Sequence, residues 1–311
     1  PQEVIGEYGA DILRLWVASA DYTSDIHLSP EILKQLSEVY RKIRNTCRFL
    51  LGNCFDFDFS KEAVDYRDLS EFDRWVLQRL NRLIKRVTQA YEECTYHIVY
   101  QALHNFCTVD LSNFYLDVQK DRLYCSAADD PARRAVQTVM MTVLESLTRL
   151  MAPVLSFTAE EIWQQLPGER LPSVQLAGWP EADPAWDDPE LERRWDELLA
   201  VRGEATRVLE EARREKLIRS SLEAALTVWA EGDLYRLLEQ YREQLAEIFI
   251  VSSVELCEGL NRAPAGAQEG QELPLKMTVK KAPAAKCPRC WIYAAPAEGE
   301  LCPRCHSLLN T

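Results

Sequence analysis

The sequence lacks the features of a membrane or exported protein. No stretch approaches the roughly 18 consecutive apolar residues of a membrane-spanning helix, so we expect no membrane segment. The opening residues Pro-Gln-Glu-Val-Ile have neither the basic region nor the apolar core of a signal peptide, so we expect no export. Because they also lack an initiator Met, we expect the chain to be a fragment of a longer protein.

The sequence motifs of common catalytic sites are missing as well. There is no glycine-rich phosphate loop, no GxSxG sequence and no HExxH sequence. The four histidines stand in no nucleophile or metal pattern; they are His27, His97, His104 and His306. We therefore predict that the chain contains no catalytic residue.

Cysteine is too sparse for a disulfide scaffold, with ten residues in a chain of 311. Together with the missing export signal, this indicates a reducing, cytoplasmic location. Six cysteines are scattered singly, and we expect most of them to be small residues of the core. They are Cys47, Cys54, Cys94, Cys107, Cys125 and Cys257.

Positive charge is scarce in most of the chain but not at its end. The net charge is −13, which taken alone argues against binding to a polyanion. Residues 271–311 nevertheless contain six basic and three acidic residues, whereas residues 1–270 have a net charge of −16. An acidic body favours solubility, and a polyanion would be attracted to the basic tail.

What the sequence does contain is helical periodicity. Apolar residues recur at spacings of three and four, which predicts neighbouring helices in a bundle. Ser29 before Pro30 has the residue types of a helix N-cap and first turn, and Ser70 with Asp73 is close to a capping box. The apolar stripes run over Ile32–Leu50, Phe72–Val87, Ile98–Val109 and on toward Tyr124, and Val136–Leu150, with a short helix at 159–166.

The chain changes character after the bundle. Five prolines and two tryptophans in residues 167–189 predict an extended connector, followed by a long helix from Asp188-Pro189 to Ala212. Alternating or β-branched residues predict strands at 224–230, 248–256 and 275–281, with a helix at 234–245 and a loose linker at 259–272. The predicted fold is therefore mainly α, with a helix bundle, a small α/β region and, because Cys287, Cys290, Cys302 and Cys305 form two CxxC pairs, a C-terminal zinc knuckle.

Six segments follow from these patterns. They are 1–25, a junction segment; 26–166, the helical bundle; 167–219, the connector and long helix; 220–258, the small α/β region; 259–285, a linker and strand; and 286–311, here called the cysteine module.

The cysteine module contains two CPRC sequences with the spacing of metal ligands. Cys287, Cys290, Cys302 and Cys305 form two CxxC pairs that can place four thiolates around one structural zinc ion. So short a segment has little apolar material for a core, so metal binding would supply most of its folding energy. The alternatives are two disulfides, a redox-active CxxC, or iron in place of zinc.

Two residues beside the first cysteine pair could contact RNA. Arg289 lies between the ligands and Trp291 follows the second one. A fixed guanidinium and an exposed indole suit unpaired bases, through hydrogen bonds to a base edge and through stacking. The alternative is that Trp291 packs on the module and Arg289 is solvated.

Further basic residues lie on predicted helices. Lys34, Arg41 and Arg48 fall seven residues apart beside an apolar stripe, and Arg79, Arg82 and Arg86 lie on the next helix. These residues could contact phosphates or form a solvated face. At the end of the long helix, Arg213, Arg214 and Lys216 could bind phosphate or complement the helix dipole.

Four stretches together resemble the bacterial isoleucyl-tRNA synthetases, in the class I group for valine, leucine and isoleucine. Gly9–Ser19 is similar to the segment that follows the KMSKS loop in this group, and Tyr40–Asn53 to the first helix of the anticodon-binding domain. Ala212–Glu223 resembles the isoleucine enzymes in particular, and Lys286–Trp291 with the second CPRC resembles their zinc module. The resemblance covers essentially the whole chain, but the HIGH motif, the nucleotide-binding fold and the editing domain are absent from it.

This resemblance implies a function. The complete enzyme would use ATP to form isoleucyl-adenylate and transfer isoleucine to tRNA(Ile), as a cytoplasmic monomer. This portion would bind the tRNA, with the helix bundle on the anticodon stem and loop, and would be inactive alone. Residues 1–25 would follow the catalytic domain, and Arg289 and Trp291 match positions that in the family would face the anticodon bases.

Two other interpretations stay open. The acidic body and a module that exposes Trp291 would also suit a zinc-knuckle adaptor that binds other proteins. A valyl or leucyl relative is the second alternative, although the terminal cysteine pairs argue against it.

Overall fold

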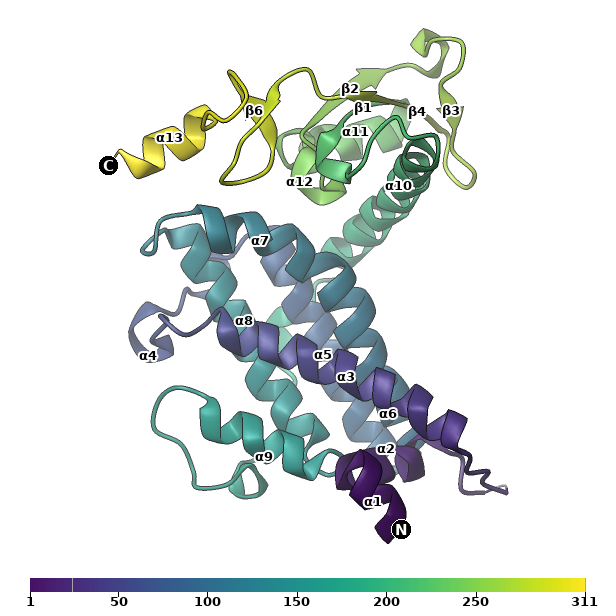
Figure 1. The fold of residues 1–311 in the computed structure, drawn as a ribbon, viewed down its shortest axis with the longest axis vertical. Coiled ribbons are helices and arrows are strands. Elements are labelled where there is room, and N and C mark those ends of the chain that lie inside the picture. Colours follow the sequence, from purple (N-terminus) through teal and green to yellow (C-terminus); the bar gives the residue numbers. More distant parts are fainter. Residues whose placement is uncertain (24, 311) are drawn as a thin grey trace. The chain divides into compact units, whose positions relative to one another are not determined.

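The computed structural model describes residues 1–23 and 25–310, in two compact units (Figure 1). The helical unit comprises Pro1–Leu123 and Ala128–Asp188, and the mixed unit comprises Tyr124–Ala127 and Pro189–Thr311. Ser24 in the predicted junction segment and Thr311 in the cysteine module lie outside the described residues. The six boundaries expected from the sequence are finer than this division and stay predictions.

Helices account for most of the helical unit. They are α1 (Gln2–Tyr8), α2 (Ala10–Ser19), α3 (Pro30–Gly52), α4 (Phe59–Glu62), α5 (Glu71–Glu92), α6 (Tyr96–Asn105), α7 (Leu116–Cys125), α8 (Pro131–Met151) and α9 (Ser156–Gln165). A π-helical segment, η2 (Phe106–Tyr115), joins α6 to α7, and the short 3-10 turns are η1 (Tyr66–Asp68), η3 (Val174–Leu176) and η4 (Pro184–Trp186). The last residues of α7 belong to the mixed unit.

The caps predicted from the sequence are present. The Ser29 hydroxyl accepts a hydrogen bond from the Ile32 N–H and Pro30 is the first residue of α3. At the start of α5, Ser70 accepts from the Asp73 N–H (3.2 Å) and its hydroxyl donates to the Asp73 carboxylate (2.6 Å). Each cap satisfies a backbone donor that the first helical turn leaves unpaired, which fixes where the helix begins.

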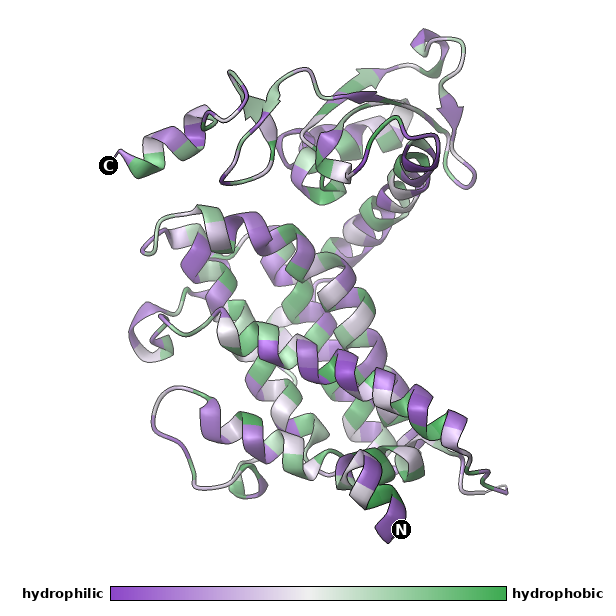
Figure 2. Cartoon of the chain, viewed as in Figure 1, coloured by the Kyte–Doolittle hydropathy of each residue, from purple (hydrophilic) through white to green (hydrophobic). Residues whose placement is uncertain are grey.

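Hydrophobic side chains between the helices form the core of this unit. Figure 2 shows hydrophobic and hydrophilic residues alternating along the ribbons of these helices, as expected for elements with one buried side. The predicted stripe of α8 is fully buried, and the largest buried side chains of the unit include Trp75, Leu80 and Leu147. Among the described residues, no helix has both the length and the apolar character that crossing a membrane requires.

The third predicted stripe was partly wrong. It placed Ile98 and Val109 on the buried side, but Val109 is 57% exposed, and the buried residues of α6 are Val99, Ala102 and Leu103. The cause is the π-helical segment that follows. Its i→i+5 hydrogen bonds shift the face of the helix relative to a period of 3.6 residues.

The mixed unit starts with a long helix and continues into a small sheet. Its elements are α10 (Pro189–Arg214), η5 (Ser221–Glu223), β1 (Ala224–Ala230), α11 (Gly232–Gln240), η6 (Arg242–Gln244), α12 (Leu245–Phe249), β2 (Ser253–Glu258), η7 (Leu260–Arg262), β3 (Gln268–Glu269), β4 (Leu275–Lys281), β5 (Ala285–Lys286), β6 (Tyr293–Ala295) and α13 (Pro303–Leu309).

The sheet has the strand order β2-β1-β4-β3. β1 runs parallel to β2, with α11 and α12 in the connection between them, and antiparallel to β4. Leu226 lies opposite Val279 and Val228 opposite Met277, and these residues share the face of the sheet that packs against helices. The predicted strand at 275–281 is therefore confirmed residue for residue as β4.

Two local predictions for this unit were wrong. Residues 248–256 were expected to form one strand, but Ile248 lies in α12 and the strand begins only at Ser253. Between them, Ile250 has a left-handed backbone conformation. Residues 259–272 were expected to be a loose linker, yet they contain η7 and β3. The Glu204 carboxylate also accepts hydrogen bonds from the backbone N–H groups of Gln271 and Glu272, which fixes the end of this segment.

At the level of fold class, the prediction is confirmed. The protein is mainly α-helical, with a helix bundle, a small α/β region and a group of four cysteines near the C-terminal end.

Candidate metal centre and nucleic-acid interface

The first CPRC sequence forms a tight turn between β5 and β6. The Cys287 N–H donates to the Ile292 carbonyl (3.0 Å), and the Trp291 N–H donates to the Cys287 carbonyl (2.9 Å). These two hydrogen bonds close the turn that contains Cys287 and Cys290. The turn therefore places both cysteines at the end of a short antiparallel pair of strands.

The second CPRC sequence starts the last helix. Cys302 is the residue before α13, Pro303 is its first residue, and the His306 N–H donates to the Cys302 carbonyl (2.9 Å). Proline suits this position because its missing N–H would be unpaired there in any case. Cys302 and Cys305 are therefore separated by one helical turn, and both are buried.

The four thiols come together at one point. All four Sγ atoms lie within 4.8 Å of one another, and the Sγ atoms of Cys290 and Cys302 are 3.7 Å apart. Zinc–sulfur bonds of about 2.3 Å in a tetrahedron place the sulfurs about 3.8 Å apart. All four cysteines are free thiols in the structure, which contradicts the alternative of two disulfides. The arrangement fits one metal ion with four sulfur ligands.

The surroundings of the thiols change their pKa values in opposite directions. Burial disfavours the thiolate of Cys287, but the backbone N–H groups of Cys290, Cys302 and Arg289 outweigh that effect and lower its pKa to about 6. Burial raises the pKa of Cys290 and Cys302 above the usual range of a thiol. A bound divalent cation would reverse this second effect, because thiols that coordinate a metal lose their protons.

The cysteine module is attached to the rest of the mixed unit at two places. The Tyr293 N–H donates to the Ser252 hydroxyl (2.8 Å), and Ser252 in turn donates to the Leu222 carbonyl. On the other side, the buried Cys125 packs in the same hydrophobic cluster as the four cysteines. No sequence pattern indicated this contact, because Cys125 stands alone and lies far from the module in the chain.

Arg289 takes part in this second attachment. Its Nη1 atom donates to the Cys125 carbonyl (2.7 Å) and lies 3.6 Å from the Cys305 Sγ atom, while the Cys125 thiol lies 3.9 Å from the Arg289 carbonyl. The side chain is half-buried rather than freely solvated. Among the described residues, no hydrogen bond is found for its Nε and Nη2 atoms, which leaves these donors for another group.

Trp291 is directed to solvent and does not pack on the module. Trp291 is 60% exposed, and the Lys286 Nζ atom lies 5.0 Å from the centre of the indole ring. The backbone at Trp291 has φ of 67°, in the left-handed region that favours glycine. The alternative in which Trp291 packs and Arg289 is solvated is thus the reverse of what the structure shows.

The basic residues predicted on the first long helix lie on the exposed side of α3. Lys34 and Arg48 have no ion pair or hydrogen bond to any described residue, whereas Arg41 forms an exposed ion pair with Glu38. Sequence reasoning missed Arg44, which lies one turn before Arg48 and forms an ion pair with Glu161 on α9 (3.2 Å). The spacing of four residues between the two arginines was the signal for it.

The basic group at the end of α10 is largely paired within its own helix. Arg213 contacts Glu210 and also donates to the Ser221 hydroxyl (3.1 Å), and Arg214 lies 3.3 Å from Glu211. Lys216 follows the helix, is exposed and has a left-handed backbone conformation.

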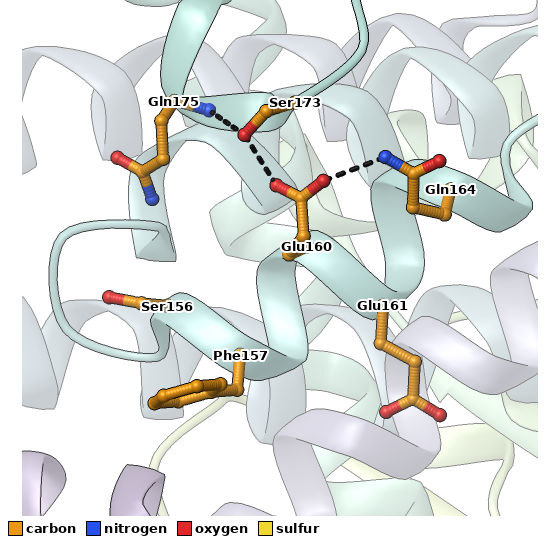
Figure 3. Close-up of a pocket in the computed structure, with 7 residues that line it drawn as sticks. All are labelled: Ser156, Phe157, Glu160, Glu161, Gln164, Ser173 and Gln175. Carbon is orange, nitrogen blue, oxygen red and sulfur yellow. Dashed lines mark hydrogen bonds between the residues drawn. The ribbon is translucent and has the colours of Figure 1, made fainter.

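Two hollows flank α9 in the helical unit. The first is an open hollow of about 420 Å³ (Figure 3). In it, the Glu160 carboxylate accepts hydrogen bonds from the Ser173 hydroxyl (2.7 Å) and the Gln164 amide (2.7 Å). Figure 3 also shows the Glu161 side chain pointing away from Glu160. Glu161 also lines the second hollow, which lies between α3 and α9.

Comparison with known proteins identifies the family to which this chain is related. Residues 73–228 match the family described as the anticodon-binding domain of tRNA ligase. The chain is 51% identical to the isoleucine–tRNA ligase of Desulforudis audaxviator and 48% identical to that of Moorella thermoacetica, in both cases over all of this chain and 34% of the relative. It is 50% identical to the isoleucine–tRNA ligase of Geobacter sulfurreducens, over 98% of this chain and 33% of the relative.

The chain thus spans about a third of the length of these relatives. The family match covers just over half of the chain and takes in most of the helix bundle, all of α10 and the start of β1. The protein belongs to the family of anticodon-binding domains of tRNA ligases.

Proposed function

We propose that this chain is the tRNA-recognition portion of an isoleucine–tRNA ligase, that it binds tRNA(Ile), and that the complete protein uses ATP to attach isoleucine to that tRNA. The relatives that align over the whole chain carry this name, which favours isoleucine over the valine and leucine alternatives. Because catalytic motifs are missing from the sequence, the chain alone is expected to bind tRNA without charging it.

We further propose that the metal held by the four cysteines is zinc. Four thiolate ligands close the coordination shell, so the ion leaves no position for a reacting water molecule and acts structurally. Its role here is to keep the turn that contains Arg289 and Trp291 rigid, because the module has few apolar residues of its own.

The observation that supports the RNA-binding role most strongly is the conformation of Trp291. A bulky residue in the left-handed region costs on the order of 1–3 kcal/mol, and such residues cluster at functional sites. Glycine would relieve this strain, yet the position holds a tryptophan that is 60% exposed. An exposed indole on a rigid turn is suited to stack on an unpaired base of the anticodon loop.

Neighbouring cations complement this surface. Lys286 lies against the Trp291 ring, and the Nε and Nη2 donors of Arg289 are placed for a base edge or a phosphate. We propose that Lys34, Arg41 and Arg48 on α3, and Arg213, Arg214 and Lys216 after α10, contact the phosphate backbone. These phosphate contacts are supported by the exposure and charge of the six side chains.

Binding of labelled tRNA transcripts tests this function. Fluorescence anisotropy would compare tRNA(Ile) with the same transcript carrying a different anticodon and with tRNA(Val), at several salt concentrations. We expect tighter binding to the isoleucine anticodon and an affinity that falls with salt as counterions are released. Equal binding to all three transcripts would contradict anticodon recognition, and capture of a protein partner that resists ribonuclease and salt would favour the adaptor alternative.

Variants of Trp291 test the stacking role directly. Trp291→Ala is expected to weaken binding of the anticodon stem-loop by roughly 1–3 kcal/mol, the range for one stacked base. Trp291→Gly is the matched variant, since it also removes the indole but relieves the left-handed backbone. Both variants should bind one metal ion per chain, and an unchanged affinity in both would return Trp291 to a structural role.

The cytoplasmic location and monomeric state expected for the complete protein stay predictions. Sedimentation of the full-length protein at micromolar concentration would test the second of these directly.

A further inference from the structure

The hollow between α3 and α9 is lined by Arg44 and Glu161, which form the ion pair described above, and by Arg48, which is proposed above to contact phosphate. The hollow measures about 270 Å³, just below the range of about 300–1,000 Å³ typical of small-molecule sites, and lies wholly within the helical unit. Its lining includes Arg44, Arg48, Leu51, Glu161, Ile162 and Gln165.

Two arginines stand on one side of this hollow. Arg44 and Arg48 are four residues apart in α3, so their side chains project from the same face of the helix. Arg48 has no hydrogen bond or ion pair to any described residue, and the Arg44–Glu161 ion pair (3.2 Å) is exposed and therefore weak. Both guanidinium groups can thus turn to an anion without losing a strong internal contact.

The charge of α3 departs from that of the protein. The helix holds five basic and two acidic residues in a chain whose net charge is −13. A positive surface on an acidic protein raises the local concentration of polyanions. The arginines at the hollow lie at the C-terminal half of this basic helix.

The other sides of the hollow are not those of a simple phosphate site. Leu51 and Ile162 supply apolar surface, and Glu161 and Gln165 supply a hydrogen-bond acceptor and an amide with both donors and an acceptor. Glu160 on the opposite side of α9 is already held by Ser173 and Gln164, whereas Glu161 is directed away from that network (Figure 3). Apolar surface beside such groups matches the flat face and polar edge of a base.

We propose that this hollow receives one unpaired ribonucleotide of the bound RNA. Arg44 and Arg48 bind its phosphate, Leu51 and Ile162 contact the face of its base, and Glu161 and Gln165 hydrogen-bond to the base edge. The inference rests on the proposed tRNA-binding function and adds to it a second base-binding site, on the helical unit and separate from the cysteine module.

Charge-neutral variants test the phosphate contact. Arg44→Gln and Arg48→Gln should each weaken tRNA binding about threefold to tenfold and reduce the slope of log affinity against log salt by about one. Arg67→Gln is the matched control, because Arg67 is an exposed arginine of the same unit that lies on η1, outside the hollow. If both hollow variants bind like Arg67→Gln, the proposal is overturned.

A second measurement tests the base contact. Short 5′-phosphorylated oligoribonucleotides would be compared with abasic oligomers of the same length and charge, by the NMR shifts of the Gln165 side-chain amide. We expect the oligoribonucleotides to shift this signal at concentrations about threefold or more below those the abasic oligomers need, and Glu161→Gln to narrow the difference. Equal shifts from both oligomers would overturn the base-binding part.

The two proposals fail in different ways. If the unaltered chain binds no tRNA, the proposed function fails. If it binds tRNA normally, and Trp291→Gly weakens that binding while Arg44→Gln and Arg48→Gln do not, the ribonucleotide site in the hollow fails together with the phosphate contact of Arg48, and the tRNA-binding function stands.

Discussion

The helical unit and the cysteine module are stabilised by different kinds of interaction. The helical unit buries large side chains such as Trp75, Leu80 and Leu147 between its helices. In the cysteine module the buried cluster consists mainly of the cysteines themselves, with Ala295 and the packed Cys125. A segment of this size cannot bury enough apolar surface to offset its conformational entropy, so a metal ion bound by the four thiols would take the place of a core.

The largest effect expected from this difference is that of removing the metal. Structural zinc contributes roughly 10–16 kcal/mol to folding of comparable short modules, so chelation should unfold the cysteine module. The helical signal in circular dichroism should stay largely intact, while four more thiols become reactive to a thiol reagent. Metal analysis before chelation should give one ion per chain, and loss of the whole helical signal would contradict two independently stabilised regions.

A cavity in the helical core should destabilise the helical unit and leave metal binding by the cysteine module unchanged. Leu80→Ala removes a side chain that is fully buried in α5, and we expect a loss of roughly 2–5 kcal/mol in the free energy of unfolding. The metal content of the chain should not change. Val109→Ala is the control, because Val109 is 57% exposed and its truncation should stay within about 0.5 kcal/mol.

A smaller effect is expected for the ion pair between Asp56 and Arg133. The two guanidinium Nη atoms lie 2.8 and 3.0 Å from the Asp56 carboxylate oxygens. The hydrogen bonds from Arg133, together with Gln137 and Arg134, lower the pKa of Asp56 below its ordinary 3.8. Asp56→Asn should therefore cost roughly 1–3 kcal/mol at neutral pH, the range for hydrogen bonds to charged groups.

The pH dependence follows from the direction of this shift. A carboxylate whose pKa is lower in the folded than in the unfolded state adds stability above the unfolded value, and that stability is lost as pH falls through the folded pKa. Urea unfolding would measure the free energy of unfolding between pH 7 and pH 3. We expect Asp56→Asn to lose less of it over this range than the unaltered chain does. Asp233→Asn, which breaks an exposed ion pair with Arg236, is the control and should change little.

The smallest effect concerns the cysteine module again. Lys286→Met removes the cation over the Trp291 ring, and we expect tRNA affinity to fall by about 0.5–1 kcal/mol, as for an exposed cation–π contact. Metal content and the free energy of unfolding should stay the same. Lys280→Met provides the comparison, because Lys280 is an exposed lysine on β4; an equal loss in both variants would assign the effect to net charge alone.

The sequence predicted the regular elements well where local interactions decide them. The caps at Ser29 and Ser70, the buried stripe of α8 and the strand β4 follow from neighbours within a few residues. The errors at Val109 and Ile248 have a common cause. In each case the backbone leaves regular geometry, by a π-helical segment or a left-handed residue, and side-chain periodicity alone does not reveal such changes.

For the candidate site, the sequence determined the four candidate metal ligands, because CxxC spacing is a local property of the chain. Only the tertiary structure decided what surrounds it. The contact of Arg289 with Cys125 joins residues 164 apart, and the hollow that places Arg44 near Glu161 joins residues 117 apart. Such contacts depend on how whole helices pack, and packing is decided by the fit of many side chains at once rather than by the residue types at two positions.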